Sequence, residues 1–79
     1  MNNRYVYRLV VNGDYETAED FYSLREVKDR VKYIMFDFET NANDWDSIIL
    51  PVDWRYNRTK FLIYKHKSGQ FTIEVDKMR

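Results

Sequence analysis

The sequence predicts a single small α+β domain with the element order ββαβββ, an antiparallel sheet with one helix packed on one face. Two observations lead to this fold class. Residues 22–38 show a sustained helical period of apolar side chains, and the segments on either side alternate apolar and polar residues as strands do. A chain of 79 residues has room for one domain, residues 1–79, with one modest core.

The predicted helix begins at Ser23 and runs to Phe38. Ser23 and Glu26 form the pattern of a capping box, in which the hydroxyl accepts from the Glu26 amide and the carboxylate reaches back to the Ser23 amide. At about 100° per residue, one arc collects the apolar side chains Leu24, Val27, Val31, Ile34, Met35 and Phe38. Tyr33 and Phe36 lie off this arc, so either a loop or the protein edge covers them or they contact a partner.

Residues 4–21 predict a β-hairpin, because a β-rich run ends at Asn12-Gly13, the strongest short hairpin signal in the chain. A two-residue loop would pair Val11 with Asp14 and turn acidic residues toward the rings of the first strand. We prefer a three-residue loop over 11–13, since a slip of one residue exchanges the two faces. The core face then holds Tyr5, Tyr7, Leu9, Tyr15, Thr17 and Phe21. The water face holds Val6, Arg8, Val10, Glu16, Ala18 and Asp20.

Three further strands follow the helix. Residues 39–46 predict a polar loop, and residues 47–52 a short apolar strand. Pro51 indicates that this strand ends there or lies at a sheet edge, because proline cannot donate to the ladder. After a second loop, residues 59–65 and 70–76 predict a hairpin joined by a three-residue loop. The expected cross-strand pairs are Phe61 with Val75, Ile63 with Ile73, and Lys60 with Asp76 as an ion pair.

The sequence offers little catalytic equipment. Its 2 glycines do not form a phosphate-binding loop, and a single histidine without any cysteine removes most nucleophilic and metal-binding arrangements. His66 lies beside a predicted turn, where a solvated role is the expectation. The acidic loop at 37–46 lacks the glycine and the final glutamate of a calcium loop. We therefore expect no enzyme activity, no cofactor and no metal.

The composition also bears on location and source. The absence of cysteine favours a reducing compartment. The first residues lack the long apolar run of a signal peptide or a membrane span, so we expect a cytoplasmic protein without membrane contact. Residues with AT-rich codons outnumber those with GC-rich codons, which is typical of a low-GC bacterium or its phage.

Charge is distributed unevenly along the chain, although the net charge is zero. Residues 1–54 carry 11 acidic and 6 basic side chains, whereas residues 55–79 carry 7 basic and 2 acidic ones. Between residues 54 and 67, basic side chains alternate with aromatic rings, as single-stranded nucleic acid binders require. The sequence pI of 6.6 and the lack of a nucleic-acid motif count against that use. The simpler interpretation is that acidic and basic stretches face each other or water.

The leading hypothesis is a small non-enzymatic protein-interaction domain of an accessory, regulatory or inhibitor kind, which occupies a surface of a larger host or self-encoded protein. The alternative is a nucleic-acid-binding module that uses residues 54–67. Homodimer formation through an exposed edge strand is compatible with both. The candidate partner-binding residues are Trp54, Arg55, Tyr56 and Arg58, followed by Tyr33, Phe36 and Trp45. Trp45 is included because it lies among acidic residues, like an aromatic anchor with a polar rim.

Overall fold

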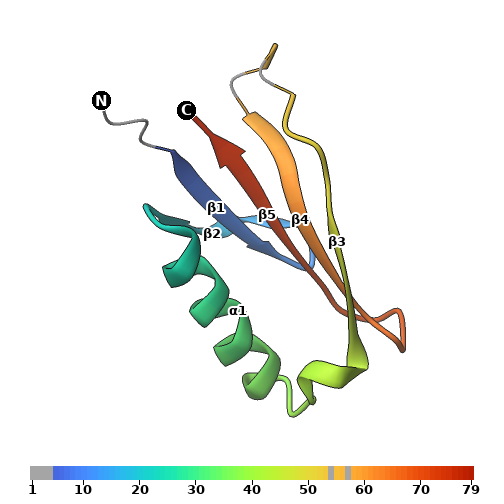
Figure 1. Ribbon diagram of the computed structural model, residues 1–79. Helices are drawn as coiled ribbons and strands as arrows, with labels where there is room; N and C mark the ends of the chain where they lie inside the picture. Colours follow the sequence, from blue (N-terminus) through green and yellow to red (C-terminus); the bar gives the residue numbers. More distant parts are fainter. Residues whose placement is uncertain (1–4, 54, 57) are drawn as a thin grey trace.

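The computed structural model describes residues 5–53, 55–56 and 58–79 of the chain. The elements in chain order are β1 Val6–Val11, β2 Asp14–Phe21, α1 Leu24–Asp37, the short 3-10 helix η1 Ala42–Asp44, β3 Trp45–Ile49, β4 Arg58–His66 and β5 Thr72–Met78. The five strands form one antiparallel sheet in the order β2-β1-β5-β4-β3, and α1 packs on one face (Figure 1). The predicted ββαβββ architecture is confirmed.

The first and last strands of the chain meet inside the sheet. β1 pairs with β5 so that Leu9 lies opposite Val75 and Val11 opposite Ile73. This arrangement leaves β2 and β3 as the two edges. β3 lies at a sheet edge, which is one of the two positions that Pro51 indicated. The strand covers Trp45–Ile49, so it begins and ends earlier than the predicted 47–52.

The helix begins where the capping pattern predicts. The Ser23 Oγ accepts a hydrogen bond from the Glu26 amide at 3.1 Å. The Glu26 carboxylate accepts from the Ser23 hydroxyl at 3.2 Å instead of from the backbone amide, so the cap closes through side chains. Every residue of the predicted stripe packs against the core: Val27, Val31, Ile34 and Met35 are buried, and Leu24 and Phe38 are partly buried.

The first hairpin closes with a two-residue turn, and the expected three-residue loop is wrong. Asn12 and Gly13 have φ values of 53° and 73°. These left-handed conformations are accessible to asparagine and glycine, and the resulting turn matches the twist of a hairpin. Val11 therefore pairs directly with Asp14.

Beyond this turn the ladder of β1 and β2 is irregular, and the irregularity decides which side chains reach the core. Phe21 lies opposite Tyr7 and packs against the core as expected. Tyr15, expected on the same face, instead lies under the guanidinium group of Arg58 on the other face, at 5.7 Å. In Figure 1, β2 crosses behind β1. Val10, which was expected to face water, is fully buried.

The last hairpin contains a bulge that the sequence pattern did not reveal. Lys60 lies opposite Asp76 as predicted, but the expected ion pair between them is wrong, since Lys60 pairs with Glu74 and Asp76 with Arg58. The register then shifts at Phe61. Beyond the bulge Leu62 takes the core position and Ile63 turns to the other face, so the expected register of the remaining pairs is wrong. The extra residue allows Phe61 and Leu62 to pack side by side against the core.

The buried core lies between the sheet and α1. Its members are Tyr7, Leu9, Val27, Val31, Ile34, Met35, Trp45, Leu62, Ile73 and Val75. Trp45 and Asp46 begin β3, so the polar loop expected at 39–46 is shorter than predicted.

Candidate protein-interaction surface

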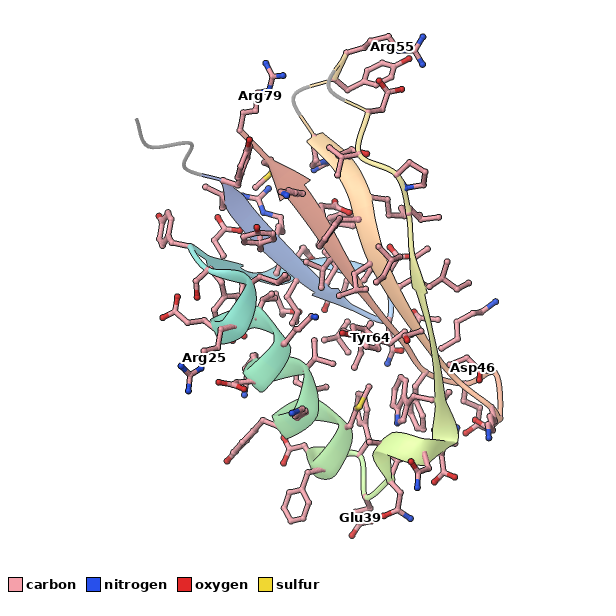
Figure 2. All side chains as sticks on the ribbon, viewed as in Figure 1. Arg25, Glu39, Asp46, Arg55, Tyr64 and Arg79 are labelled. Carbon is pink, nitrogen blue, oxygen red and sulfur yellow. The ribbon has the colours of Figure 1, made fainter. Side chains whose placement is uncertain are left out.

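The predicted partner-binding residues lie in separate parts of the molecule. Arg55, in the loop before β4, is at the opposite end of the molecule from Glu39, which follows α1 (Figure 2). The longest dimension of the fold is 40 Å. Tyr33 and Phe36 lie on α1, whereas Trp54 lies outside the described residues. The described members of the predicted set therefore do not form one continuous surface.

Within the loop before β4, Arg55 is exposed but already paired. Its Nη2 lies 2.7 Å from the Asp53 Oδ2, and its backbone amide donates to the Asp53 Oδ1 at 3.1 Å. These bonds lower the pKa of Asp53 and raise the pKa of Arg55. The guanidinium group also lies 5.8 Å from the ring centroid of the exposed Tyr56.

Two further cations of the basic stretch are paired with acids of β5. The Arg58 Nε lies 3.6 Å from the Asp76 Oδ2, and the Lys60 Nζ lies 3.0 Å from the Glu74 Oε1. Asp76 is only 3% exposed, and burial raises its pKa, opposed by the positive charges of Arg58 and Lys60. The acids and the cations of both pairs belong to residues 55–79, so these pairs do not join the acidic stretch of the chain to the basic one. They leave fewer cations for a polyanion.

The two aromatic side chains on α1 are open to solvent. Tyr33 is 60% and Phe36 is 77% exposed, so the expected cover by a loop or the protein edge is wrong for both. The Arg30 guanidinium group lies 5.4 Å from the ring of Tyr33. Because α1 turns its apolar stripe inward, these rings project from the outer side of the helix.

Trp45 is buried and does not provide the exposed anchor that the sequence suggested. It is 7% exposed, and its Nε1 donates to the Thr40 Oγ1 at 2.8 Å. The ring of Phe38 is stacked on the ring of Phe71 at 4.6 Å, and both lie near the indole, at 6.3 Å. Alternation along β3 places residue 45 on the helix-facing side, and this geometry decides its burial in spite of the acidic residues around it.

The edge strand β3 offers backbone groups without a neighbouring strand. The carbonyl of Asp44 and the amide of Leu50 both bond to the β4 hairpin at 2.9 Å. Because hydrogen-bonded positions alternate in an antiparallel pair, the residues between them with outward-facing N–H and C=O groups are Ser47 and Ile49. The side chain of Ile49 is 70% exposed and that of Ile48 is 49% exposed. The open edge thus carries both apolar side chains and free peptide groups.

A groove of about 380 Å³ lies beside this edge, between α1 and the strands β3 and β4. Its lining residues are Lys28, Val31, Lys32, Met35, Ala42, Trp45, Ser47 and Tyr64. Figure 2 shows Tyr64 between α1 and β3, and burial raises the pKa of its hydroxyl. Among the described residues, the Tyr64 hydroxyl has no protein hydrogen-bond partner. Lys28 and Lys32 form no ion pair with an acidic side chain of the described chain.

From Pro51 the sequence indicated an edge position for this strand, but it did not identify the strand as the binding surface, and it did not predict the groove. A signal was present, because Ile48, Ile49 and Leu50 are consecutive apolar residues in a short strand without a lysine to protect its edge. The groove had no such signal. It depends on where α1 lies relative to β3, and these elements come together only through the sheet order.

Comparison with known proteins adds no relative. No family model, curated protein or solved structure matches this chain. In the described part of the chain, no three histidine or acidic side chains are grouped closely enough to hold a metal ion. None of its helices is long and apolar enough to span a bilayer.

Proposed function

We propose that this chain is a protein-interaction domain of an accessory, regulatory or inhibitor kind, which binds a larger protein through the open edge formed by β3. The observation that carries the proposal is the outward-facing backbone of Ser47 and Ile49 next to the exposed side chains of Ile48 and Ile49. Peptide groups and apolar side chains on the same edge are what strand addition uses for affinity and specificity.

The other sheet edge has a different character, which supports the choice of β3. β2 carries four acidic side chains among its eight residues, Asp14, Glu16, Glu19 and Asp20. Charged side chains on an edge strand hinder the approach of another strand. β3 carries only Asp46 as a charged residue. Its edge therefore lacks the protection that β2 has.

The other exposed groups are assigned a secondary role. Arg55 and Tyr56 lie beyond the end of β3, and Tyr33 and Phe36 lie on the outer side of α1. Arg55 and Tyr56 would extend a contact that the β3 edge begins, whereas Tyr33 and Phe36 would form a separate one. We propose that this contact occurs in the cytoplasm, since a chain without cysteine suits a reducing compartment.

The proposal is tested by substituting Ile49→Lys and comparing the proteins captured from a lysate of the source cell. A lysine on an edge strand blocks strand addition, while its effect on stability stays within about 0.5 kcal/mol at so exposed a position. Thr17→Lys, at an exposed position of β2, is the matched control. We expect the same captured proteins for the wild type and Thr17→Lys and their loss for Ile49→Lys.

Two results would count against this function. One is a capture pattern that Ile49→Lys leaves unchanged while circular dichroism shows all variants folded. The other is retention of DNA or RNA at low salt that is lost steeply as salt is added, which is the signature of the nucleic-acid alternative.

A further inference from the structure

We infer that the β3 edge and the adjoining groove bind an extended acidic segment of the partner, which adds to the sheet as a sixth strand and inserts one apolar side chain into the groove. This inference rests on the proposed function and names the chemistry of the ligand. It follows from three features of the described residues: the direction of the peptide groups, the shape of the groove and the charge at its rim.

The backbone requires an extended ligand. Ser47 and Ile49 present N–H and C=O groups two residues apart, which is the spacing at which a neighbouring strand exchanges hydrogen bonds. Alternate side chains of the added strand then point to opposite faces of the sheet. Those on the face of Ser47 meet the groove, and those on the other face meet the exposed side chain of Ile48.

The groove accepts an apolar side chain from that added strand. Its walls include the apolar side chains of Val31, Met35 and Trp45. Ser47 separates the groove from the strand edge, and its small side chain leaves the way open for a larger one from a neighbouring strand. The Tyr64 hydroxyl offers one hydrogen bond at the groove lining, where it has no protein partner among the described residues.

The rim of the groove selects for negative charge. Lys28 and Lys32 line it from α1, four residues apart on the same side of the helix. Two like charges at this spacing repel each other, and a carboxylate between them relieves the repulsion. No acidic residue lines the groove within the described chain. An acidic side chain of the ligand, two positions from the inserted apolar residue, supplies the missing charge.

A second copy of the chain fits this surface less well. Antiparallel pairing of two identical edges relates the copies by a two-fold axis perpendicular to the sheet, so both helices lie on the same face of the joined sheet. The lysine pairs of both copies would then border the same interface, with no acid in either groove to oppose them. An acidic segment of another protein removes this conflict.

The test is a selection from a display library of random peptides of about 12 residues, long enough to cover the edge strand. The full chain is presented as the wild type, as Ile49→Lys, and as the double variant Lys28→Glu/Lys32→Glu. The control is Lys65→Glu/Lys67→Glu, which makes the same change of charge on side chains outside the groove. Circular dichroism confirms the fold of each variant before use.

We expect the wild type to enrich peptides with an acidic residue two positions from an apolar one, so that both lie on the same face of the added strand, and Ile49→Lys to enrich none of them. By fluorescence anisotropy, these peptides should bind Lys28→Glu/Lys32→Glu about tenfold more weakly than the wild type, and the control within about twofold. The groove variant should itself enrich peptides with basic residues at the acidic positions, because the rim charge is reversed.

Several results would overturn the inference. These are enriched peptides without an acidic preference, an equal loss of affinity in the control, or no enrichment relative to Ile49→Lys. Sedimentation showing a dimer that Ile49→Lys dissociates would assign the edge to a second copy. Failure here with continued Ile49-dependent capture of a cellular protein would refute the acidic segment and leave the proposed function standing.

Discussion

Arg30 of α1 binds Glu19 of β2 through two hydrogen bonds, at 2.8 Å from Nε to Oε1 and at 3.3 Å from Nη2 to Oε2. Glu19 lies opposite Leu9 of β1, so its carboxylate leaves the sheet on the helix-facing side. The bond raises the pKa of Arg30. This pair connects the helix to the charged edge strand, at the side of the sheet away from the groove.

The substitution Glu19→Gln should lower the free energy of unfolding by about 0.5 kcal/mol, because partly exposed ion pairs contribute little in water. The loss should shrink at high salt, where the charges are screened. Urea denaturation at low and high salt measures both effects. Glu16→Gln, on the same strand but in no described ion pair, is the control, and an equal loss in both variants would contradict a specific link.

Thr40 connects the end of α1 to the core indole. Its Oγ1 donates to the Met35 carbonyl at 2.7 Å and accepts from the Trp45 Nε1 at 2.8 Å. Thr40→Val should therefore leave the indole N–H without its acceptor and destabilise the fold by about 1 kcal/mol. Thermal unfolding measures the loss. Thr17→Val at an exposed position should cost much less, and a loss as large as for Thr40→Val would argue against the bond.

Asp76 should make the fold less stable as pH rises. Burial raises its pKa, and its Oδ1 has no hydrogen-bond partner among the described residues. A carboxyl group with a higher pKa in the folded state holds its proton more tightly there. The stabilisation that Asp76 contributes is therefore present below the pKa of its carboxyl group in the unfolded chain, about 4. It is lost as pH rises through the higher pKa of the folded state.

The variant Asp76→Asn should remove this loss and raise the free energy of unfolding at neutral pH by about 1 kcal/mol, since a buried charge without full hydrogen bonding is costly. Denaturation at several pH values measures the slope. A variant that is less stable at neutral pH, with an unchanged slope, would show instead that Arg58 and the other cations stabilise the ionised carboxylate.

Asp20 provides a control of opposite sign. Its hydrogen bonds to Arg8, at 2.8 and 3.0 Å, lower its pKa. The stabilisation that Asp20 contributes is present above the pKa of its carboxyl group in the unfolded chain. It is lost as pH falls through the lower pKa of the folded state. Asp20→Asn should weaken the fold at neutral pH by a small amount and reduce its sensitivity to acid. A change in the same direction as for Asp76→Asn would contradict these assignments.

Amide hydrogen exchange should alternate along β3. The amides of Asp46 and Ile48 bond to β4, whereas those of Ser47 and Ile49 face the open edge. We expect slow exchange at the first two positions and fast exchange at the other two, read residue by residue by NMR. Uniform protection of all four amides in the isolated protein would mean that the edge is already paired with another strand.

Local signals in the chain predicted much of this architecture. Ser23 and Glu26 mark the helix start, because a cap involves residues only three positions apart. The apolar stripe of α1 and the strand end before Pro51 depend on neighbouring residues in the same way. The order and type of α1 and the five strands follow from such short-range patterns, whereas the short 3-10 helix η1 lies in a segment predicted to be a loop.

The strand registers were not predicted, although the local preference of Asn12-Gly13 for a two-residue turn was present in the sequence. The turn at Asn12-Gly13 and the bulge at Phe61 each shift a strand relative to its neighbour, and a shift of one residue exchanges the faces of the sheet. Packing between residues distant in the sequence therefore placed Tyr15 and Ile63 on faces that the alternation alone did not indicate.

The candidate site was harder to predict than the fold, for a related reason. Composition drew attention to the rings and cations before β4, yet Arg55 and Arg58 are engaged by acids, and Trp45 lies in the core. The β3 edge exists because the pairing of β1 with β5 leaves β3 last in the sheet. Residue spacing specifies what each segment becomes, whereas only long-range strand pairing specifies which segment is left without a neighbour, because that depends on the energy of the whole assembled sheet.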